Sequence, residues 1–236
     1  LSTIDTTRIS AAGGTNAGNG TVFLFDITQT GGNLIVDGQP GVESRYSALP
    51  IPSGYVLDNI TLRNNARVKV DGELVVNDTL SILTGSVLTH SPGNEDGVTI
   101  TAERLYVDET SALDASGKGY PGGKTAGNPS DYGITLGGLT GSSFRSGGSY
   151  GGLGVNVDSG ATPNPVYGTP ENPVYLGSGG SRGYYGEAGG NGGGRITISA
   201  SRVVEVDGAI RADGAAGGGS NAGDGSGGSV LIHTAL

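Results

Sequence analysis

Short stretches of alternating apolar and polar residues recur along this chain, and glycine-rich stretches separate them. The segment 195–206, RITISASRVVEV, alternates in this way, whereas the preceding segment 176–194 is rich in glycine. Alternation with a period of two is typical of β-strands that bury one face, and no stretch repeats apolar residues at helical spacing. The pattern therefore predicts an all-β chain.

Two of these stretches align without a gap within residues 55–90, at a spacing of 20 residues. The alignment pairs Asp58 with Asp78, Ile60 with Leu80, Thr61 with Ser81, Leu62 with Ile82 and Val68 with Leu88, and continues from Leu80 to Ile100 and from Ser81 to Thr101. A period of this size, with short strands and no helix between them, is typical of a solenoid.

The fold predicted from this repeat is a right-handed parallel β-helix that forms a single domain over residues 1–236. One coil cannot bury its own apolar side chains, so stacked coils should place Ile60, Leu80 and Ile100 in one inward column. Thr61 and Ser81 should face outward with Thr101. Glycine is expected at the corners, where tight bends or positive φ angles are needed.

Longer repeats link more distant parts of the chain. Residues 97–119 resemble 194–216, which pairs Ile100 with Ile198, Ala102 with Ala200, Arg104 with Arg202 and, after a gap, Leu113 with Ile210. Residues 8–26 resemble 210–234, with NAGNG in the first copy against NAGDG in the second. These repeats predict a window excised from a longer array, with similar units as neighbours.

A glycine- and tyrosine-rich insert is predicted over residues 118–193, and it holds eight of the 13 aromatic residues. Tyrosine combines a flat apolar face, which stacks on sugar rings, with a hydroxyl that hydrogen-bonds, so tyrosines beside carboxylates suit glycan binding. The alternative is that the rings form a satellite core that fixes the insert. The candidate ligand-binding residues are Tyr120, Tyr132, Tyr150, Tyr167, Tyr175, Tyr184, Tyr185, Asp131, Asp158, Glu171 and Glu187.

Asp58 and Asp78 are the candidate metal ligands, because stacking would hold the two carboxylates about 5 Å apart. A pair at that distance could bind Ca²⁺ or supply the two carboxyl groups of a retaining glycosidase. The alternative is turn chemistry, in which each carboxylate accepts hydrogen bonds from its own backbone. Turn chemistry is favoured, Ca²⁺ comes next, and no residue is assigned a catalytic role.

The net charge of −9 argues against nucleic acid as a partner, because binding to phosphates needs a basic surface. No apolar run is long enough to span a bilayer. Cysteine is absent, so the redox compartment cannot be read from the sequence.

The stretches LDASGKGYPGG, VYGTPENPVYLGSGG, GGNGGGRITISASRVVEVDGAIRADG and GDGSGGSVLIHT resemble a glycine-rich repeat of large secreted or surface proteins of bacteria, mostly uncharacterised and adhesin-like. The resemblance implies parallel β-helix coils and an extracellular or cell-surface location, and it carries over no catalytic residues. The function expected is a structural or adhesive module that contacts glycans or another surface protein through the insert. The alternatives are a β-helical polysaccharide lyase or glycoside hydrolase, and a self-associating filament subunit.

Overall fold

The computed structural model describes residues 4–14, 17–26, 30–39, 45–49, 51, 55–156, 159–219 and 221–235. The regular elements of these residues are strands, apart from two short 3-10 helices, Thr6–Arg8 and Leu136–Gly138. The strands are β1 (Gly20–Leu24), β2 (Asn33–Asp37), β3 (Ser47–Ala48), β4 (Leu57–Arg63), β5 (Arg67–Lys69), β6 (Gly72–Ile82), β7 (Val87–Thr89), β8 (Val98–Val107), β9 (Ala112–Asp114), β10 (Ile134–Thr135), β11 (Leu139–Thr140), β12 (Arg195–Val206), β13 (Ala209–Arg211) and β14 (Ser229–Thr234).

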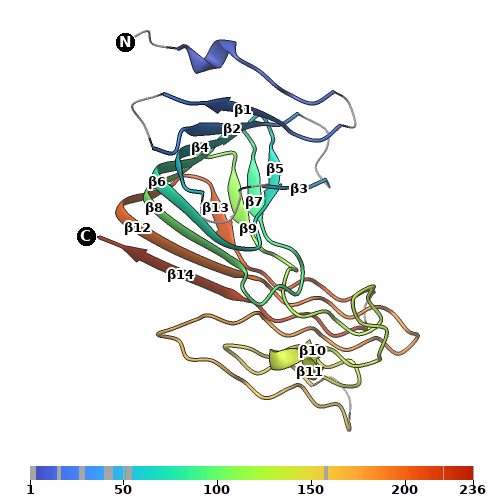
Figure 1. The fold of residues 1–236 in the computed structure, drawn as a ribbon. Helices are drawn as coiled ribbons and strands as arrows, with labels where there is room; N and C mark the ends of the chain where they lie inside the picture. Colours follow the sequence, from blue (N-terminus) through green and yellow to red (C-terminus); the bar gives the residue numbers. More distant parts are fainter. Residues whose placement is uncertain are drawn as a thin grey trace.

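Two sheets enclose the apolar core (Figure 1). The large sheet has seven strands in the order β1-β2-β4-β6-β8-β12-β14, and the small sheet has five in the order β13-β9-β7-β5-β3. The core takes Ile60 and Leu80 from the large sheet and Val68, Leu88 and Leu113 from the small sheet. The period-two alternation of these strands therefore buries one face of each sheet, as expected from the sequence.

The predicted register is confirmed between β4 and β6, where Ile60 lies opposite Leu80 and Leu62 opposite Ile82. It is also confirmed between β5 and β7, where Val68 lies opposite Leu88. Between β12 and β8, Ile198 pairs with Ile100 and Ala200 with Ala102, and Ile210 of β13 pairs with Leu113 of β9.

Bulges overturn the rest of the predicted register. A shift between Val75 and Thr79 of β6 places Ile100 opposite Leu74, and Leu80 opposite Leu105. The same shift puts Ser81 beside Tyr106 and Thr101 beside Val75. A second shift, between Ala200 and Val203 of β12, sets Arg104 opposite Val203 instead of Arg202. The prediction failed here because an inserted residue changes the pairing without interrupting the apolar alternation.

The predicted right-handed parallel β-helix is wrong. The large sheet is mixed, because β1 runs antiparallel to β2, and β10 and β11 form a separate antiparallel pair. The described residues between β9 and β12 add no strand to either of the two main sheets. A solenoid coil must place a row of apolar side chains between its sheets, and the glycine-rich segments offer few, such as Tyr120 and Leu176.

The glycine-rich segments instead form a second body, which we call the glycine bundle: residues 118–123, 176–183, 188–194, 212–217 and 222–228. Segment 188–194 exchanges backbone hydrogen bonds with all four other segments, whereas a β-strand in a sheet has only two neighbours. The bonds recur in steps of three residues: the amides of Tyr120 and Gly123 donate to Gly177 and Gly180. Three residues per turn and no internal hydrogen bonds are the properties of polyproline II helices.

Close approach of backbones explains why these segments are glycine. A Cβ atom at any of thirteen bundle positions would lie 1.9 to 2.3 Å from a backbone oxygen of another part of the chain, which belongs to another bundle segment in every case except Gly223, and none of them has a positive φ. The positions are Gly119, Gly122, Gly177, Gly179, Gly180, Gly189, Gly190, Gly192, Gly193, Gly214, Gly223, Gly225 and Gly228. The predicted role of glycine at solenoid corners therefore does not account for this part of the chain.

Candidate functional site

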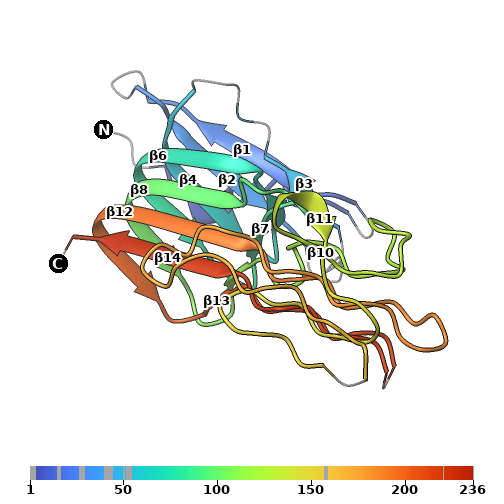
Figure 2. The same ribbon diagram turned by 90° about the horizontal axis from the view of Figure 1, so that it is seen from below.

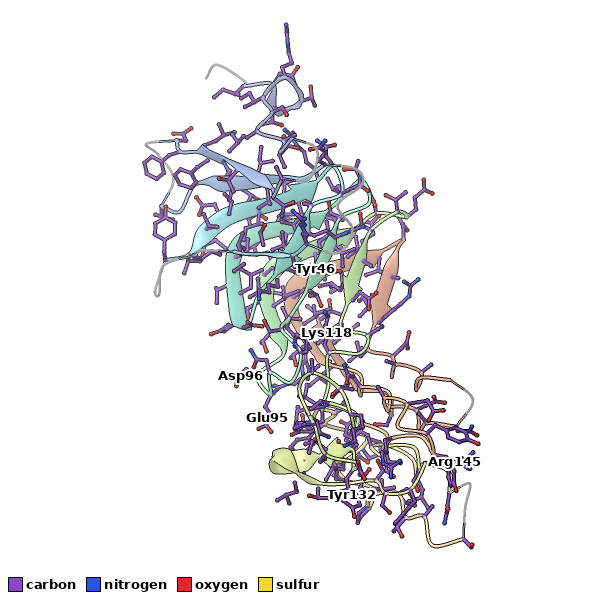
Figure 3. The ribbon with its side chains drawn as sticks, turned by 90° about the vertical axis from the view of Figure 1, so that its right-hand side faces the viewer. Tyr46, Glu95, Asp96, Lys118, Tyr132 and Arg145 are labelled. Atoms are coloured by element: carbon purple, nitrogen blue, oxygen red, sulfur yellow. The ribbon has the colours of Figure 1, made fainter. Side chains whose placement is uncertain are left out.

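A pocket of about 690 Å³ lies on the loops that project from the glycine bundle. Figure 3 shows two of its residues, Tyr132 and Arg145, at the end of the molecule away from the two sheets. Its lining consists of Asp131, Tyr132, Phe144, Arg145, Ser159, Arg182, Gly183 and Tyr184. The pocket thus combines aromatic rings with ionised groups on loops that the bundle supports.

Asp131 ties two of these loops together. Its carboxylate lies 2.9 Å from Lys124 Nζ and 2.9 Å from Arg182 Nε. The backbone amide of Arg182 also donates to the carbonyl oxygen of Asp131. Hydrogen bonds from Lys124 and then Arg182 hold the pKa of the Asp131 carboxyl below its ordinary value. Each ion pair is solvent-exposed and contributes little stability by itself, so the effect of the cluster is to orient the side chains.

The aromatic side chains of the pocket expose their ring faces. Phe144 and Tyr184 are 64% and 70% exposed, and Tyr185, beside Tyr184, is 82% exposed. The rings of Tyr184 and Tyr185 are 5.1 Å apart and nearly perpendicular. Rings this exposed bury little apolar area in the free protein, so packing alone does not account for their place on the surface.

A short turn presents Tyr184 and Tyr185. The amide of Gly183 donates to the carbonyl oxygen of Glu187, and Gly186 has a φ of 92°, which only glycine adopts readily. The Glu187 carboxylate accepts a hydrogen bond of 2.9 Å from the amide of Tyr185. Glu187 therefore fixes the turn that carries the two rings.

The backbone at Phe144 and Arg145 is strained, with φ angles of 45° and 63°. Arg145 donates from Nε to the carbonyl oxygen of Asn221 at 2.9 Å and from Nη2 to its side-chain oxygen at 2.6 Å. Non-glycine residues with positive φ are uncommon and often occur at functional sites. Phe144 lines the pocket at this strained turn.

The structure separates the predicted tyrosines into two groups. Tyr132 and Tyr184 line the pocket with Asp131, and Tyr185 and Glu187 belong to the adjoining turn. Glu171 is exposed and does not line the pocket, and Asp158 lies outside the described residues.

Among the other predicted tyrosines, Tyr120 and Tyr150 are buried and anchor the loops, whereas Tyr175 is 38% exposed. Tyr120 is buried, donates to Glu95 Oε1 at 2.7 Å and accepts from the amide of Gly137. Burial, followed by the hydrogen bond to Glu95, raises the pKa of its phenol. Tyr150, Tyr167 and Tyr175 form a chain of ring contacts, with centroids 5.0 and 6.1 Å apart. Burial raises the pKa of Tyr167 to about 12.

Phe144, Arg145, Ser159 and Arg182 line the pocket but were not predicted as site residues. Arg182 lies in the run GGSRG, where the surrounding glycines carry no signal of a binding site. Phe144 is one of only three phenylalanines in the chain, which is the one signal that could have indicated it.

Asp58 lies at the bulge between β4 and β6, where Leu57 pairs with Val76 and Asn59 with Thr79, so the ladder gives Asp58 no register partner. The Asp58 carboxylate accepts hydrogen bonds from Asn77 Nδ2 at 2.9 Å and from the amides of Gly31 and Gly32. The bond from Asn77 is the main cause of a lowered pKa at Asp58. Asp78 pairs with Arg104. Both carboxylates thus have protein partners, and Ca²⁺ binding by them stays a prediction.

Comparison of the chain with protein-family models, with curated proteins and with solved structures finds no match. In the part of the chain that the structure describes, no helix has the length and apolar character needed to cross a bilayer.

Proposed function

We propose that this chain is a carbohydrate-binding module of an extracellular surface protein, and that the pocket at the end of the glycine bundle takes the sugar. The observation that carries the proposal is that the exposed rings of Phe144 and Tyr184 line the pocket with the ion-paired Asp131, with the exposed ring of Tyr185 against Tyr184. Apolar ring faces stack on the C–H face of a sugar, and carboxylate and guanidinium groups hydrogen-bond its hydroxyls.

The size and support of the pocket agree with this role. A volume of about 690 Å³ lies within the range of small-ligand sites, roughly 300 to 1,000 Å³. The bundle holds its segments by backbone hydrogen bonds, so the loops project from a scaffold whose rigidity does not depend on the exposed rings. A site that is formed before the ligand arrives loses less conformational entropy on binding.

The number of carboxylate side chains at the pocket favours sugar binding over sugar hydrolysis. A glycosidase needs two carboxyl groups on either side of the scissile bond. Among the described residues that line the pocket, Asp131 is the only one with a carboxylate, and it already pairs with Lys124 and Arg182. The extracellular location rests only on the resemblance of the glycine-rich stretches to repeats of bacterial surface proteins.

A glycan array tests the proposal with the double variant Tyr184→Ala, Tyr185→Ala. The matched control is Phe23→Ala, Phe25→Ala, which removes another pair of exposed, mutually contacting rings, from β1 and the residue after it. We expect the tyrosine variant to lose at least about tenfold in affinity at an unchanged melting temperature, and the control to bind as the wild type does. A wild type that binds no glycan, or a tyrosine variant that binds normally, would overturn the proposal.

A further inference from the structure

A second pocket, of about 370 Å³, adjoins the pocket proposed to take the sugar. Arg145 lines both pockets, so they meet at this side chain. The lining of the second pocket also includes Leu153, Val155, Asn221 and Asp224. Figure 2 shows the glycine-rich segments and their loops extending away from the two sheets, and both pockets are built from these loops.

The two pockets lie on one hydrogen-bonded backbone surface. The amide of Ser181 donates to the carbonyl oxygen of Ser146 at 3.0 Å, and the amide of Gly223 donates to the carbonyl oxygen of Ser181 at 2.9 Å. Arg145, beside Ser146, and Arg182, beside Ser181, line the first pocket, and Gly223 lines the second. The bonds thus fix the segments beneath one pocket against those beneath the other.

The boundary between the pockets is also fixed. The two hydrogen bonds from Arg145 to Asn221 hold the guanidinium in place, and Asn221 itself lines the second pocket. A ligand that extends from one pocket into the other therefore passes over a positioned side chain. No rearrangement of the backbone is needed to bring the two pockets together.

Exposed apolar side chains continue from the first pocket into the second. Leu153 and Val155 are 68% and 70% exposed, as much as Phe144 and Tyr184 in the first pocket. The carbonyl oxygen of Val155 accepts a hydrogen bond from the amide of Gly147, so the backbone sets the place of this residue. Apolar surface on both sides of Arg145 suits a chain of sugar rings, each of which carries an apolar C–H face.

The charges around the two pockets balance. The charged residues that line them, among those that the structure describes, are Arg145, Arg182, Asp131 and Asp224. Two guanidinium groups and two carboxylates give no net charge, whereas the whole chain carries −9. An acidic chain would therefore gain no excess of cations at the pockets and would be repelled by the rest of the protein, so the charges favour a neutral ligand.

We propose that the two pockets form one groove that binds a neutral polysaccharide along its length, across Arg145. This inference rests on the proposed function and extends its site to a second pocket. Together the two volumes exceed roughly 1,000 Å³, the upper end of the range for sites that take one small ligand. Pyranose rings joined through equatorial oxygens form an extended chain with accessible C–H faces, so we expect chains of this kind to bind.

Isothermal titration calorimetry with cellobiose, cellohexaose, mannobiose and mannohexaose tests the groove. A disaccharide can occupy one pocket, whereas a hexasaccharide can reach both. We expect the hexasaccharide of at least one series to bind at least about tenfold more tightly than its disaccharide. The matching uronate hexasaccharide, with a carboxylate on each ring in place of the hydroxymethyl group, should bind at least about tenfold more weakly than the neutral one.

The double variant Leu153→Ala, Val155→Ala removes the apolar side chains of the second pocket. We expect it to bind the hexasaccharide only as tightly as the disaccharide, and to bind the disaccharide as the wild type does. The matched control is Leu139→Ala, Val166→Ala, which removes an exposed leucine and an exposed valine that line neither pocket. All four side chains are exposed, so both variants should fold normally, which a thermal melt checks.

The outcomes separate the groove from the proposed function. A hexasaccharide that binds no more tightly than its disaccharide, a preference for the uronate chain, or equal effects of the two double variants would overturn the groove. The same holds if the glycan array shows binding of single terminal sugars only. Failure of every sugar to bind, here and on the array, would overturn the proposed function and the groove with it.

Discussion

At the scale of single residues, glycine has two different uses in this chain. Gly186 provides a positive φ at the turn beside the pocket, which is the use that the sequence suggests for glycine in general. In the glycine bundle the angle is ordinary, and the requirement is the absence of a Cβ atom where backbones meet. The sequence alone cannot distinguish these two uses, because both requirements select glycine.

Gly180→Ala should destabilise the protein, because its Cβ would lie 2.1 Å from the carbonyl oxygen of Gly223. Overpacking of this kind typically costs about 1 to 3 kcal/mol, and here the obstacle is backbone that cannot rotate away. Gly151→Ala is the control, since a Cβ there meets nothing within 4 Å and its φ is not positive. Urea unfolding should show a clear loss for Gly180→Ala and none for Gly151→Ala. Equal effects would refute the close-approach explanation.

The sequence predicted that the tyrosines of the loops are important, but not which of them are buried and which are exposed. The number of tyrosines indicated either a binding site or a small core that fixes the loops. The structure contains rings of both kinds: Tyr120 is buried and Tyr184 is exposed. Whether a given ring is buried depends on contacts between distant segments, such as the bond from Tyr120 to Glu95, 25 residues away. No local pattern records such a contact.

At the scale of elements, the alternation of apolar residues predicted the strands and part of their register. The match of Ile60 with Leu80 held because β4 and β6 are continuous there. It failed one strand later, where the bulge in β6 moved Leu80 from Ile100 to Leu105. Bulges leave the alternation on either side intact, so the register beyond them has to be seen in the structure.

Leu80→Ala should cost about 2 to 5 kcal/mol, because Leu80 is fully buried between β4 and β8 and the cavity cannot collapse. Leu153→Ala is the matched control, since Leu153 lies in the loops and is largely exposed. The free energies of unfolding, measured by urea titration, should fall for Leu80→Ala and change by less than about 0.5 kcal/mol for Leu153→Ala. A small loss at Leu80 would mean that the two-sheet core is not the main source of stability.

At the scale of the whole molecule, the chain passes between the two sheets and the glycine bundle four times: after β9, before β12, after β13 and before β14. His90 lies at this junction and is fully buried. Its Nε2 accepts a hydrogen bond of 3.1 Å from the amide of Arg195, the first residue of β12. Its Nδ1 lies 2.9 Å from the carbonyl oxygen of Ser91, so Nδ1 carries the proton and the ring is neutral.

Burial is the main cause of a lowered pKa at His90, and it outweighs the carbonyl of Ser91 and the charge of Asp71, which act in the opposite direction. The unfolded chain takes up a proton as the pH falls below about 6.5, whereas the folded chain resists it. Stability should therefore be constant above this pH and should decline below it, by at most about 1.4 kcal/mol per pH unit, until the folded ring also becomes protonated. Protonation of Nε2 removes the acceptor for Arg195 and so loosens the junction.

Urea unfolding at a series of pH values between 7.5 and 5 measures this decline, and His90→Gln supplies the control. Glutamine can place an acceptor near the position of Nε2 but does not titrate, so its variant should be less stable at pH 7.5 and nearly independent of pH over the same interval. Carboxylates with lowered pKa values, such as Asp58, lose their contribution to the free energy of unfolding only at a lower pH, outside the measured interval. His233, the other histidine, is exposed. If the stability of the wild type does not decline, or if the glutamine variant shows the same decline, His90 is not the group that makes stability depend on pH.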